Sequence, residues 1–528
     1  MRQEAKSSQS DRCAERPMLR TAILILSLCP ALFAASGKFV ITKDIRNALS
    51  QISADSLRGH VSFLASDVLE GRCTPSRGGD LAAEYIAAQF RRAGLQPAGD
   101  DGYFQTANWR LFEQPMDGFE MKIEKGKQSF PIGKDQVWLY PYTALDLSAL
   151  PVVKLNLTQE VKSDEVKGKV VAVVFSADAS EGHEQYLQLT RLGKALEAAK
   201  PALILILAPD CQSEISTRLE DPNDPPGIAP PIHICNPQVI KLLNESESGP
   251  TNLALSLHLP APSVKQVKLR NVIGLLPGSD PVLKETYVLA TAHYDHIGIE
   301  SEGDLKRIYH GADDDASGTA SVIELASALM RLKQKPRRSM GFMAFFGEEM
   351  GLIGSRYYVR HPAFPVAKTI ADINLEVLGR TDTSKGKEIG KLWFTGFDYS
   401  EMPSIFQSAG RQTGIEVYKH ELYSDQFFVA SDNATLASMG VPAHSASVTA
   451  DLEDVHGVGD IWPKLDYENM VKVDRAIALG LLMIANKPEP PKWNEANPKA
   501  EPYFKAWKEH PIAPKLSDYW PWVPGSCK

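Results

Sequence analysis

The chain has 528 residues and a formal net charge of −8, with 43% hydrophobic and 23% charged residues. This composition is typical of a globular protein that buries a large core, and its acidic balance argues against a nucleic-acid-binding protein. Because single hydrophobic cores stop growing at about 250–300 residues, we expect at least two domains.

Residues 1–36 have the pattern of a secretory signal peptide. Arg16 and Arg20 precede the apolar run TAILILSLCPALFAA, which gives way to small residues and is too short to span a membrane. The in-frame Met18 is a second candidate start, because the segment that follows it has every part of the signal. The pattern predicts a protein that is secreted or periplasmic after cleavage and has no membrane span.

The cysteines beyond this segment are too few and too scattered for a disulfide scaffold or a cysteine zinc site. They are Cys73, Cys211, Cys235 and Cys527. An exported protein allows one or two disulfides. Cys211 and Cys235 flank a Pro-rich loop, which predicts a bond between them, with Cys73 or Cys527 as the alternative partner.

Two amphipathic helices are predicted near the mature N-terminus. In residues 55–66 the apolar side chains fall on one helical face, and residues 79–95 repeat the pattern before Gly94, a candidate C-terminal cap. The region 113–262 differs, because short β-rich runs flank one helix-like segment and a Pro-rich loop follows. This region is interpreted as a separate small domain.

Strands and helices alternate from Val264 onward. The predicted strands are 271–278, 286–296, 339–349, 369–379 and 391–397, and the predicted helices are 316–332, 351–359, 404–414 and 467–485. This alternation favours a mostly parallel sheet covered by helices on both faces. A Pro-rich segment then begins an extended tail that contains Trp493, Trp507, Trp520 and Trp522.

Side chains that can bind metal ions follow several of these strands. In open α/β sheets functional residues collect at the carboxyl ends of the strands. The segments concerned are TAHYDH with His293 and Asp295, GADDDASG with its clustered aspartates, FFGEE with Glu348 and Glu349, NLEVLG with Glu376, and DLEDVHG with His456. Alternation along a strand places His293 and Asp295 on the same side, so the carboxylate can orient the imidazole.

Each feature taken alone has a simpler explanation. A lone histidine is more often structural than a ligand, an aspartate run is commonly a solvated turn, and adjacent glutamates usually face water. Glu376 is harder to explain in this way, since an ionised carboxylate in an apolar strand needs a partner. The order of the segments at successive strand ends is what favours a metal site.

The blocks HYDH, GADDDASG, FFGEEMGLIGS, NLEVLG and EDVHG resemble the co-catalytic two-zinc exopeptidases. That family includes secreted bacterial leucyl aminopeptidases, glutamate carboxypeptidase II and, without catalysis, the transferrin receptor. The resemblance covers most of 52–112 and 264–487. It implies a zinc aminopeptidase-like α/β catalytic domain in 37–112 and 263–487, an inserted protease-associated domain in 113–262, and a Pro/Trp-rich tail in 488–528.

Carried over position by position, the resemblance implies two zinc ions held by five side chains. His293 and Glu376 bind one ion, Glu349 and His456 bind the other, and Asp314 bridges them. The resemblance also implies that Glu348 is the general base. Successive side chains at a strand end point apart, so Glu349 can turn to the metal while Glu348 faces the water and substrate. The family also implies a cis peptide bond after the bridging aspartate.

These residues predict a secreted zinc exopeptidase, an aminopeptidase that acts on peptides, with no indication of its oligomeric state. Glu376 stands where family aminopeptidases usually have Asp, which leaves a carboxypeptidase or dipeptidase open. Val455 stands where some members have an oxyanion-donating Tyr. A non-catalytic binding protein is disfavoured because every candidate ligand and the base are present, and glutaminyl cyclase chemistry on one zinc is a more distant alternative.

Overall fold

The computed structural model describes residues 39–139, 143–174, 182–207, 217–223, 231–302, 305–383, 386–450 and 454–515. The predicted signal peptide, residues 1–36, lies outside these ranges. The chain separates into two compact units, residues 1–41 and 42–528, and the folded elements belong to the second. Within the described ranges, none of the helices has both the length and the apolar character that crossing a membrane demands.

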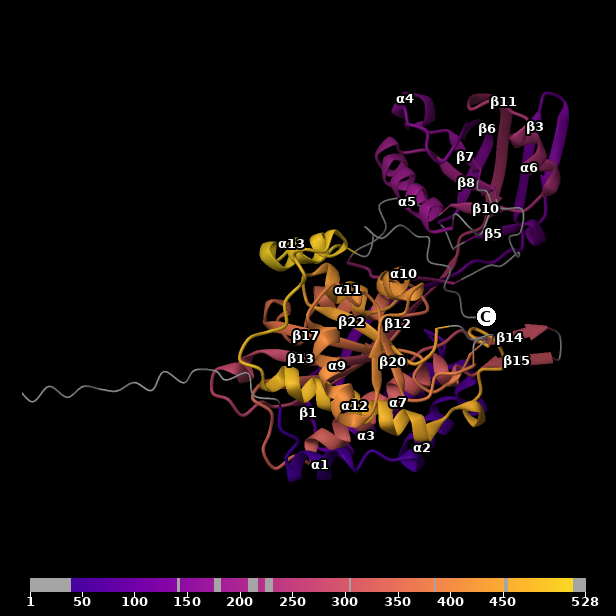
Figure 1. Cartoon of the computed structure of the whole chain (residues 1–528). Coiled ribbons are helices and arrows are strands. Elements are labelled where there is room, and N and C mark those ends of the chain that lie inside the picture. The colour runs from indigo at the N-terminus through magenta and orange to yellow at the C-terminus, as the bar shows by residue number, and fades with distance from the viewer. Residues whose placement is uncertain are drawn as a thin grey trace, which may run out of the picture. The chain divides into compact units, whose positions relative to one another are not determined.

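The larger sheet has ten strands (Figure 1). They are β1 (Gln96–Pro97), β2 (Phe104–Glu113), β9 (Arg218–Glu220), β12 (Ser263–Leu276), β13 (Tyr287–His293), β16 (Ser339–Phe345), β17 (Thr369–Leu375), β20 (Lys391–Phe394), β21 (Glu416–Tyr418) and β22 (Ala443–Ser447). The strand order is β21-β20-β22-β17-β13-β16-β12-β2-β9, and β1 pairs with β12.

This sheet is mixed rather than mostly parallel: its four central strands are parallel, and so are β20 and β21 at one edge. Strands β22, β17, β13 and β16 run parallel to one another. Antiparallel pairing begins at β12 on one side and at β20 on the other. The carboxyl ends of β13, β16 and β17 therefore meet at one edge, where a site can form.

The helices around this sheet are α1 (Lys43–Leu49), α2 (Ala54–Leu64), α3 (Arg77–Ala93), α7 (Gly318–Met330), α8 (Ile353–Arg360), α9 (Met402–Thr413), α10 (Tyr423–Gln426), α11 (Asn433–Ser438), α12 (Tyr467–Asn486) and α13 (Glu501–Glu509). They include every helix predicted above. Gly94 ends α3 in the left-handed conformation, with φ of 86°, which confirms the predicted cap.

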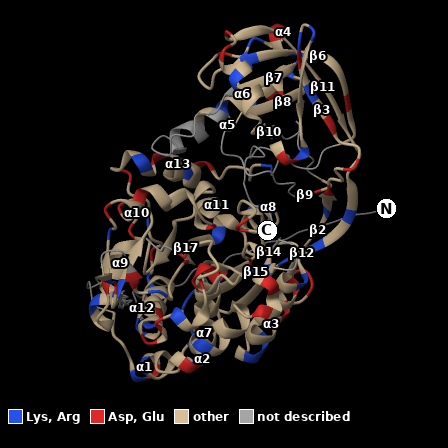
Figure 2. Ribbon diagram, turned by 90° about the vertical axis from the view of Figure 1, so that its right-hand side faces the viewer, with Lys and Arg blue, Asp and Glu red and all other residues tan. Residues whose placement is uncertain are grey.

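Both faces of the sheet are covered by helices. Leu289 of β13 and Phe345 of β16 pack in one buried cluster with Tyr358 of α8 and Leu436 of α11. The alternating neighbours in these strands point to the opposite face, where α3 and α7 contact β12 and β13. Figure 2 shows acidic and basic residues interspersed along these helices and strands.

A second sheet of eight strands forms from the middle of the chain. Its strands are β3 (Glu120–Lys125), β4 (Gln128–Ile132), β5 (Val137–Leu139), β6 (Leu145–Leu155), β7 (Val170–Val174), β8 (Leu203–Leu207), β10 (Ile232–Ile234) and β11 (Gly249–Leu259), in the order β4-β3-β11-β6-β7-β8-β10-β5. Helices α4 (Ser163–Val166), α5 (Gly182–Ala199) and α6 (Pro237–Asn244) belong to the same region.

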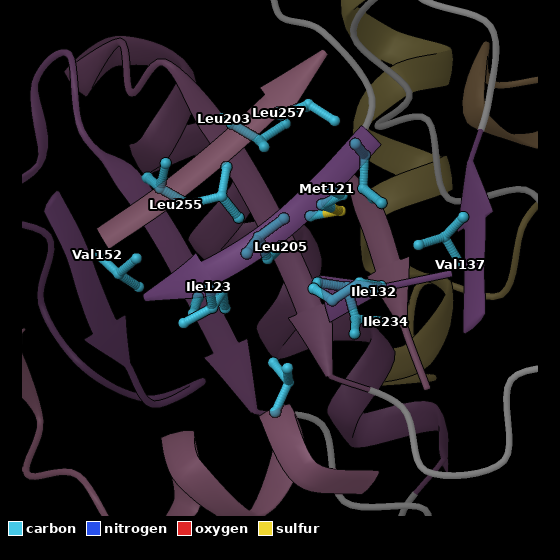
Figure 3. Close-up of a cluster of buried hydrophobic side chains, with 14 of the residues drawn as sticks. Met121, Ile123, Ile132, Val137, Val152, Leu203, Leu205, Ile234, Leu255 and Leu257 are labelled. Atoms are coloured by element: carbon cyan, nitrogen blue, oxygen red, sulfur yellow. The ribbon is translucent and has the colours of Figure 1, made fainter. Parts of the chain in front are cut away.

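This region has a hydrophobic core of its own. Ile123, Val152, Leu205, Ile234 and Leu255 are buried together on one face of the eight-stranded sheet (Figure 3). The identity of residues 113–262 as a protease-associated domain stays a prediction. Two short hairpins complete the described strands, β14 (Gly298–Glu302) with β15 (Leu305–Tyr309) and β18 (Asp382–Thr383) with β19 (Gly386–Lys387).

The prediction of an extended C-terminal tail is wrong for the described residues up to 515. Residues Glu501–Glu509 form helix α13. Trp493 is buried, with 4% of its surface exposed, and stacks on Tyr503 with ring centroids 5.4 Å apart. Aromatic packing therefore holds this segment in spite of its prolines. Trp520 and Trp522 lie outside the described residues.

Cys73 and Cys235 are both disulfide-bonded. Cys211 and Cys527 lie outside the described residues. The bond between Cys211 and Cys235 therefore stays a prediction.

Candidate metal centre

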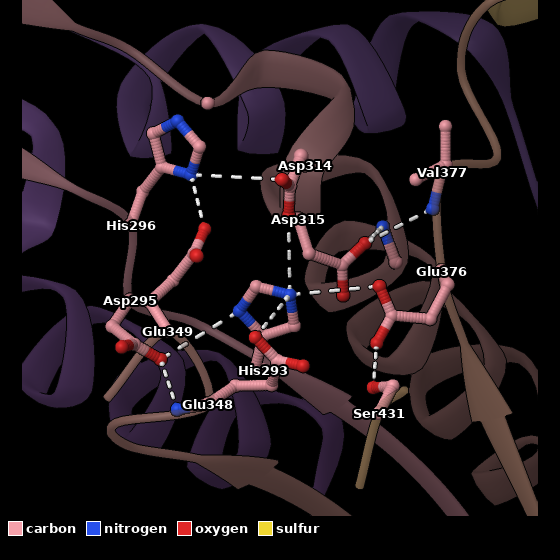
Figure 4. Close-up of polar contacts among 12 residues, drawn as sticks. His293, Asp295, His296, Asp314, Asp315, Glu348, Glu349, Glu376, Val377 and Ser431 are labelled. Atoms are coloured by element: carbon pink, nitrogen blue, oxygen red, sulfur yellow. Dashed lines mark hydrogen bonds and ion pairs between the residues drawn. The ribbon is translucent and has the colours of Figure 1, made fainter. Parts of the chain in front are cut away.

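All the candidate ligands predicted from the sequence come together near the carboxyl ends of the central strands. Figure 4 shows four of them, His293, Asp314, Glu349 and Glu376. His293 is the last residue of β13, and Glu376 directly follows β17. Asp314 lies in the turn that leads into α7, and His456 lies in the loop before α12.

Strands β13 and β16 end earlier than predicted. Strand β13 stops at His293 and β16 at Phe345, so Asp295, Glu348 and Glu349 lie in the loops that follow. The alternation along a strand does not apply to these residues. Their side chains are placed by loop contacts instead.

The first group of donor atoms surrounds the imidazole of His293. Its Nε2 atom lies 3.2 Å from Oδ1 of Asp314 and 3.5 Å from Oε2 of Glu376. Oε2 of Glu348 lies farther away, at 4.0 Å. The His293 side chain is buried, with 1% of its surface exposed. The donor atoms of His293, Glu348 and Glu376 lie within 4.8 Å of one another and form a group that could hold an ion.

The second group surrounds His456. Its Nε2 atom lies 3.1 Å from Oδ2 of Asp314 and 3.1 Å from Oε2 of Glu349. The His456 side chain is 51% exposed, so this group faces solvent on one side. Asp314 therefore turns one carboxylate oxygen to each group, which is the arrangement of a bridging ligand.

The loop that carries Asp314 is fixed by its backbone. The peptide bond between Asp314 and Asp315 is cis, which confirms the expectation from the family resemblance. The backbone N–H groups of Asp313 and Asp314 donate to the Asp460 carboxylate at 2.9–3.1 Å. The Asp313 carboxylate in turn accepts from the backbone N–H of Gly379 at 2.6 Å.

Further side chains contact the candidate ligands and orient them. Oδ1 of Asp295 lies 3.6 Å from Nδ1 of His293, an ion-pair distance longer than a hydrogen bond. Oε1 of Glu376 accepts from the Ser431 hydroxyl and, at 3.0 Å, from the Asn374 side chain. Oε2 of Glu376, which faces His293, is left for a cation.

His296 also lies in the centre, although sequence reasoning did not single it out. Its ring is fully buried, and Nδ1 lies 2.8 Å from Oε1 of Glu349. The signal was present, because His296 is the last residue of the HYDH motif. The loop after β13 turns it towards the second group of donor atoms, and a strand pattern cannot predict such a turn.

The charged groups of the centre strongly shift the pKa values of one another. Hydrogen bonds to Asp314 and Glu349 raise the pKa of His456 to about 10. Burial and the Asp314 carboxylate would raise the pKa of Glu349, but hydrogen bonds with His296 and His456 outweigh them and lower it to about 2. Burial, together with Glu349 and Glu376, raises the pKa of Glu348 well above its usual range.

The donor set fits a pair of divalent cations. The buried or largely buried carboxylates of Asp295, Asp314, Glu348, Glu349 and Glu376 cannot all be ionised at such close range without positive charge between them. Nδ1 of His293 and Oδ2 of Asp295 are buried without a hydrogen-bond partner in the described part of the chain. Imidazole and carboxylate donors together suit zinc.

The mixed α/β fold resembles that of zinc aminopeptidases. Residues 271–480 match the model of peptidase family M28.

Two curated relatives resemble parts of this chain. Leupeptin-inactivating enzyme 1 of Streptomyces exfoliatus is 28% identical over 198 residues, which cover 36% of this chain and 39% of the relative. A probable zinc metalloprotease of Pyrenophora teres f. teres is 35% identical over 124 residues, or 23% of this chain and 25% of the relative. The chain therefore spans well under half the length of either relative.

Among solved structures, an aminopeptidase from Aneurinibacillus sp. strain AM-1 has a similar fold. The TM-score is 0.56 at 17% identity, and the match covers 86% of this chain and 97% of that chain. At this identity the likeness supports the fold alone.

Proposed function

We propose that this protein is a secreted aminopeptidase that binds two zinc ions and hydrolyses the N-terminal peptide bond of peptides. The observation that carries the proposal is the position of Asp314, whose two oxygens lie 3.2 Å and 3.1 Å from the imidazoles of two different histidines. The match of residues 271–480 to the model of peptidase family M28 supports peptide hydrolysis. The basic and apolar pattern of residues 1–36 supports export.

His293 and Glu376 would hold one ion, Glu349 and His456 the other, and Asp314 both. When bound, such a pair of ions polarises the scissile carbonyl, acidifies a water molecule and stabilises negative charge on oxygen.

Glu348 is the proposed general base. Its carboxylate takes a proton from the attacking water and returns it to the leaving amine. Burial and the neighbouring carboxylates raise its pKa, which makes the ionised form a stronger proton acceptor. Its Oε2 atom is 4.0 Å from Nε2 of His293, farther than the oxygens of Asp314 and Glu376, although Glu348 also belongs with His293 and Glu376 to a group of donor atoms that could hold an ion.

Glu376 favours a second candidate, a carboxypeptidase or dipeptidase on the same scaffold, because family aminopeptidases usually have Asp at this position. A carboxypeptidase needs a cation for the C-terminal carboxylate of its substrate. Arg72 is fully buried and donates to the backbone carbonyls of Tyr294 and Gly311. Arg380 donates to the carboxylates of Asp382 and Asp454. Neither of these two arginines has a free guanidinium, so neither supports the carboxypeptidase.

Metal analysis and a paired peptide assay test the proposal. The purified protein should contain two zinc ions per chain, cleave peptides with a free N-terminus, leave N-blocked peptides intact and lose activity with a chelator. Cleavage of N-blocked peptides from the C-terminus would support the carboxypeptidase. Metal binding without cleavage of either substrate would support a binding protein. A stoichiometry of one zinc ion per chain, even with excess zinc, would contradict the bridging role of Asp314.

A further inference from the structure

We propose that His296 is a positioning residue that holds Glu349 in the orientation needed for the second metal ion. This inference rests on the metal centre of the proposed function. It concerns the one histidine of the centre to which the family pattern assigned no role.

The contacts of Glu349 divide between its two oxygens. Oε1 lies 2.8 Å from Nδ1 of His296, whereas Oε2 lies 3.1 Å from Nε2 of His456. An ionised carboxylate only accepts hydrogen bonds, so Nδ1 of His296 carries the proton and donates it to Oε1. This bond fixes the carboxylate by one oxygen and leaves the other for a cation.

The ring of His296 is held firmly enough to act in this way. It is fully buried. It also packs closely against Gly311, where a Cβ atom would lie only 2.5 Å from the ring carbon Cγ. Position 311 must therefore be glycine for the His296 ring to fit. Its other nitrogen, Nε2, has no hydrogen-bond partner among the described residues, so the contact with Glu349 sets the tautomer.

His296 belongs with Asp314 and Glu349 to a group of donor atoms that could hold an ion, but the individual distances favour a hydrogen bond over direct ligation by His296. Donor atoms that share one tetrahedral zinc ion lie about 3.3 Å apart, since each is about 2 Å from the metal. The 3.1 Å separations of His456 from Asp314 and Glu349 are close to this value. Nδ1 of His296 instead lies 2.8 Å from Glu349 and 3.9 Å from Asp314.

The first donor group has the same arrangement. Ser431 and Asn374 donate to Oε1 of Glu376, while its Oε2 faces His293. Each terminal carboxylate of the centre thus has one oxygen held by the protein and one turned to the donor atoms. Partners of this kind orient ligands, and their removal typically lowers metal affinity by about 10–100-fold.

The test measures zinc affinity of the metal-free protein by competition with a chromophoric chelator. His456→Ala first identifies which binding step belongs to the second position. His296→Ala should weaken that step by about 10–100-fold and leave the other step unchanged. His296→Asn should restore most of the affinity, because the Asn amide nitrogen can occupy the position of Nδ1 and donate to Oε1.

His444 provides the matched control, because it is equally buried and bonds to Ser400 and to the backbone of Thr395. His444→Ala should lower the melting temperature of the metal-free protein without changing either zinc step. If His296→Ala does not fold, the comparison of His296→Asn with His296→Gln takes its place. The Gln amide extends to the position of Nε2, so only the Asn variant should bind the second zinc well.

Three outcomes would overturn the inference. Unchanged zinc affinity in His296→Ala would reduce His296 to a packing role, while leaving the proposed function in place. Equal losses in His296→Asn and His296→Ala would make His296 a direct ligand. A natural protein that binds no zinc would remove the proposed metal centre itself and the role of His296 with it.

Discussion

The backbone N–H of Glu348 donates to Oδ1 of Asp295 at 3.1 Å. The same oxygen lies 3.6 Å from Nδ1 of His293. One buried carboxylate thus connects the turn that carries the proposed base with the histidine of the first donor group. Asp295 thus contacts both the backbone of the proposed base and a proposed zinc ligand.

We expect Asp295→Asn to separate these two contributions. The Asn oxygen can still accept from the Glu348 backbone, so the turn should stay in place. The loss of the negative charge should lower the affinity for the zinc ion held by His293 and Glu376 by about 10–100-fold, as for other residues that orient a ligand. Asp295→Ala should also disturb the turn and lower turnover further, even with saturating zinc. Equal turnover of the two variants at saturating zinc would show that the contact with Glu348 has no effect.

The adjacent glutamates should behave differently when each is changed to Gln. Glu348→Gln should keep both zinc ions and the fold, while turnover falls by about 10²–10⁴, the usual contribution of a positioned base. Glu349→Gln should weaken the second zinc and recover part of its activity with added metal by mass action. Metal content and turnover of both variants check this, and exchanged phenotypes would exchange the two roles.

The sequence predicted the layered α/β fold because apolar strands and amphipathic helices have distinct periods. It also predicted the segments that gather in the centre, although not the role of His296, since the carboxyl ends of parallel strands meet at one edge. His293 and Glu376 lie at such ends, as expected. Strand lengths were overestimated, because the apolar run before Glu348 continues past Phe345 into a turn.

Contacts between distant loops were beyond sequence reasoning. Ser431 reaches Glu376 from a segment 55 residues away, and His296 reaches Glu349 across 53 residues. Neither pair has a spacing that a helix or strand pattern encodes. The prediction of an extended C-terminal tail was wrong for a related reason. The packing of Trp493 against Tyr503 outweighs the extended tendency of the prolines in this segment.

Ser431→Ala should lower the affinity for the zinc ion held by His293 and Glu376 and leave the affinity for the other zinc ion unchanged. It removes one of the two donors to Oε1 of Glu376 and leaves Asn374, so we expect a loss towards the lower end of the 10–100-fold range, about tenfold. Ser424→Ala is the control, since Ser424 is also buried but donates to the backbone of Phe394. A chelator titration that gives the same two zinc affinities for both variants would contradict this role.

The melting temperature of the metal-free protein should fall as the pH rises from about 6.5 towards 10. The partners Asp314 and Glu349 raise the pKa of His456 from 6.5 to about 10. A raised histidine pKa stabilises the fold fully below the unfolded value of 6.5, and this contribution is lost as the pH passes through the folded value. Glu349 acts in the opposite sense. Its pKa is lowered from 4.5 to about 2, so its contribution to the stability of the fold is fully present above pH 4.5 and is lost as the pH falls towards 2.

Bound zinc requires a neutral His456, so the zinc-loaded protein should not show the alkaline decrease in melting temperature. Calorimetric scans of both forms across this range check the prediction, and an alkaline decrease of equal size in the zinc-loaded protein would assign it to groups outside the centre.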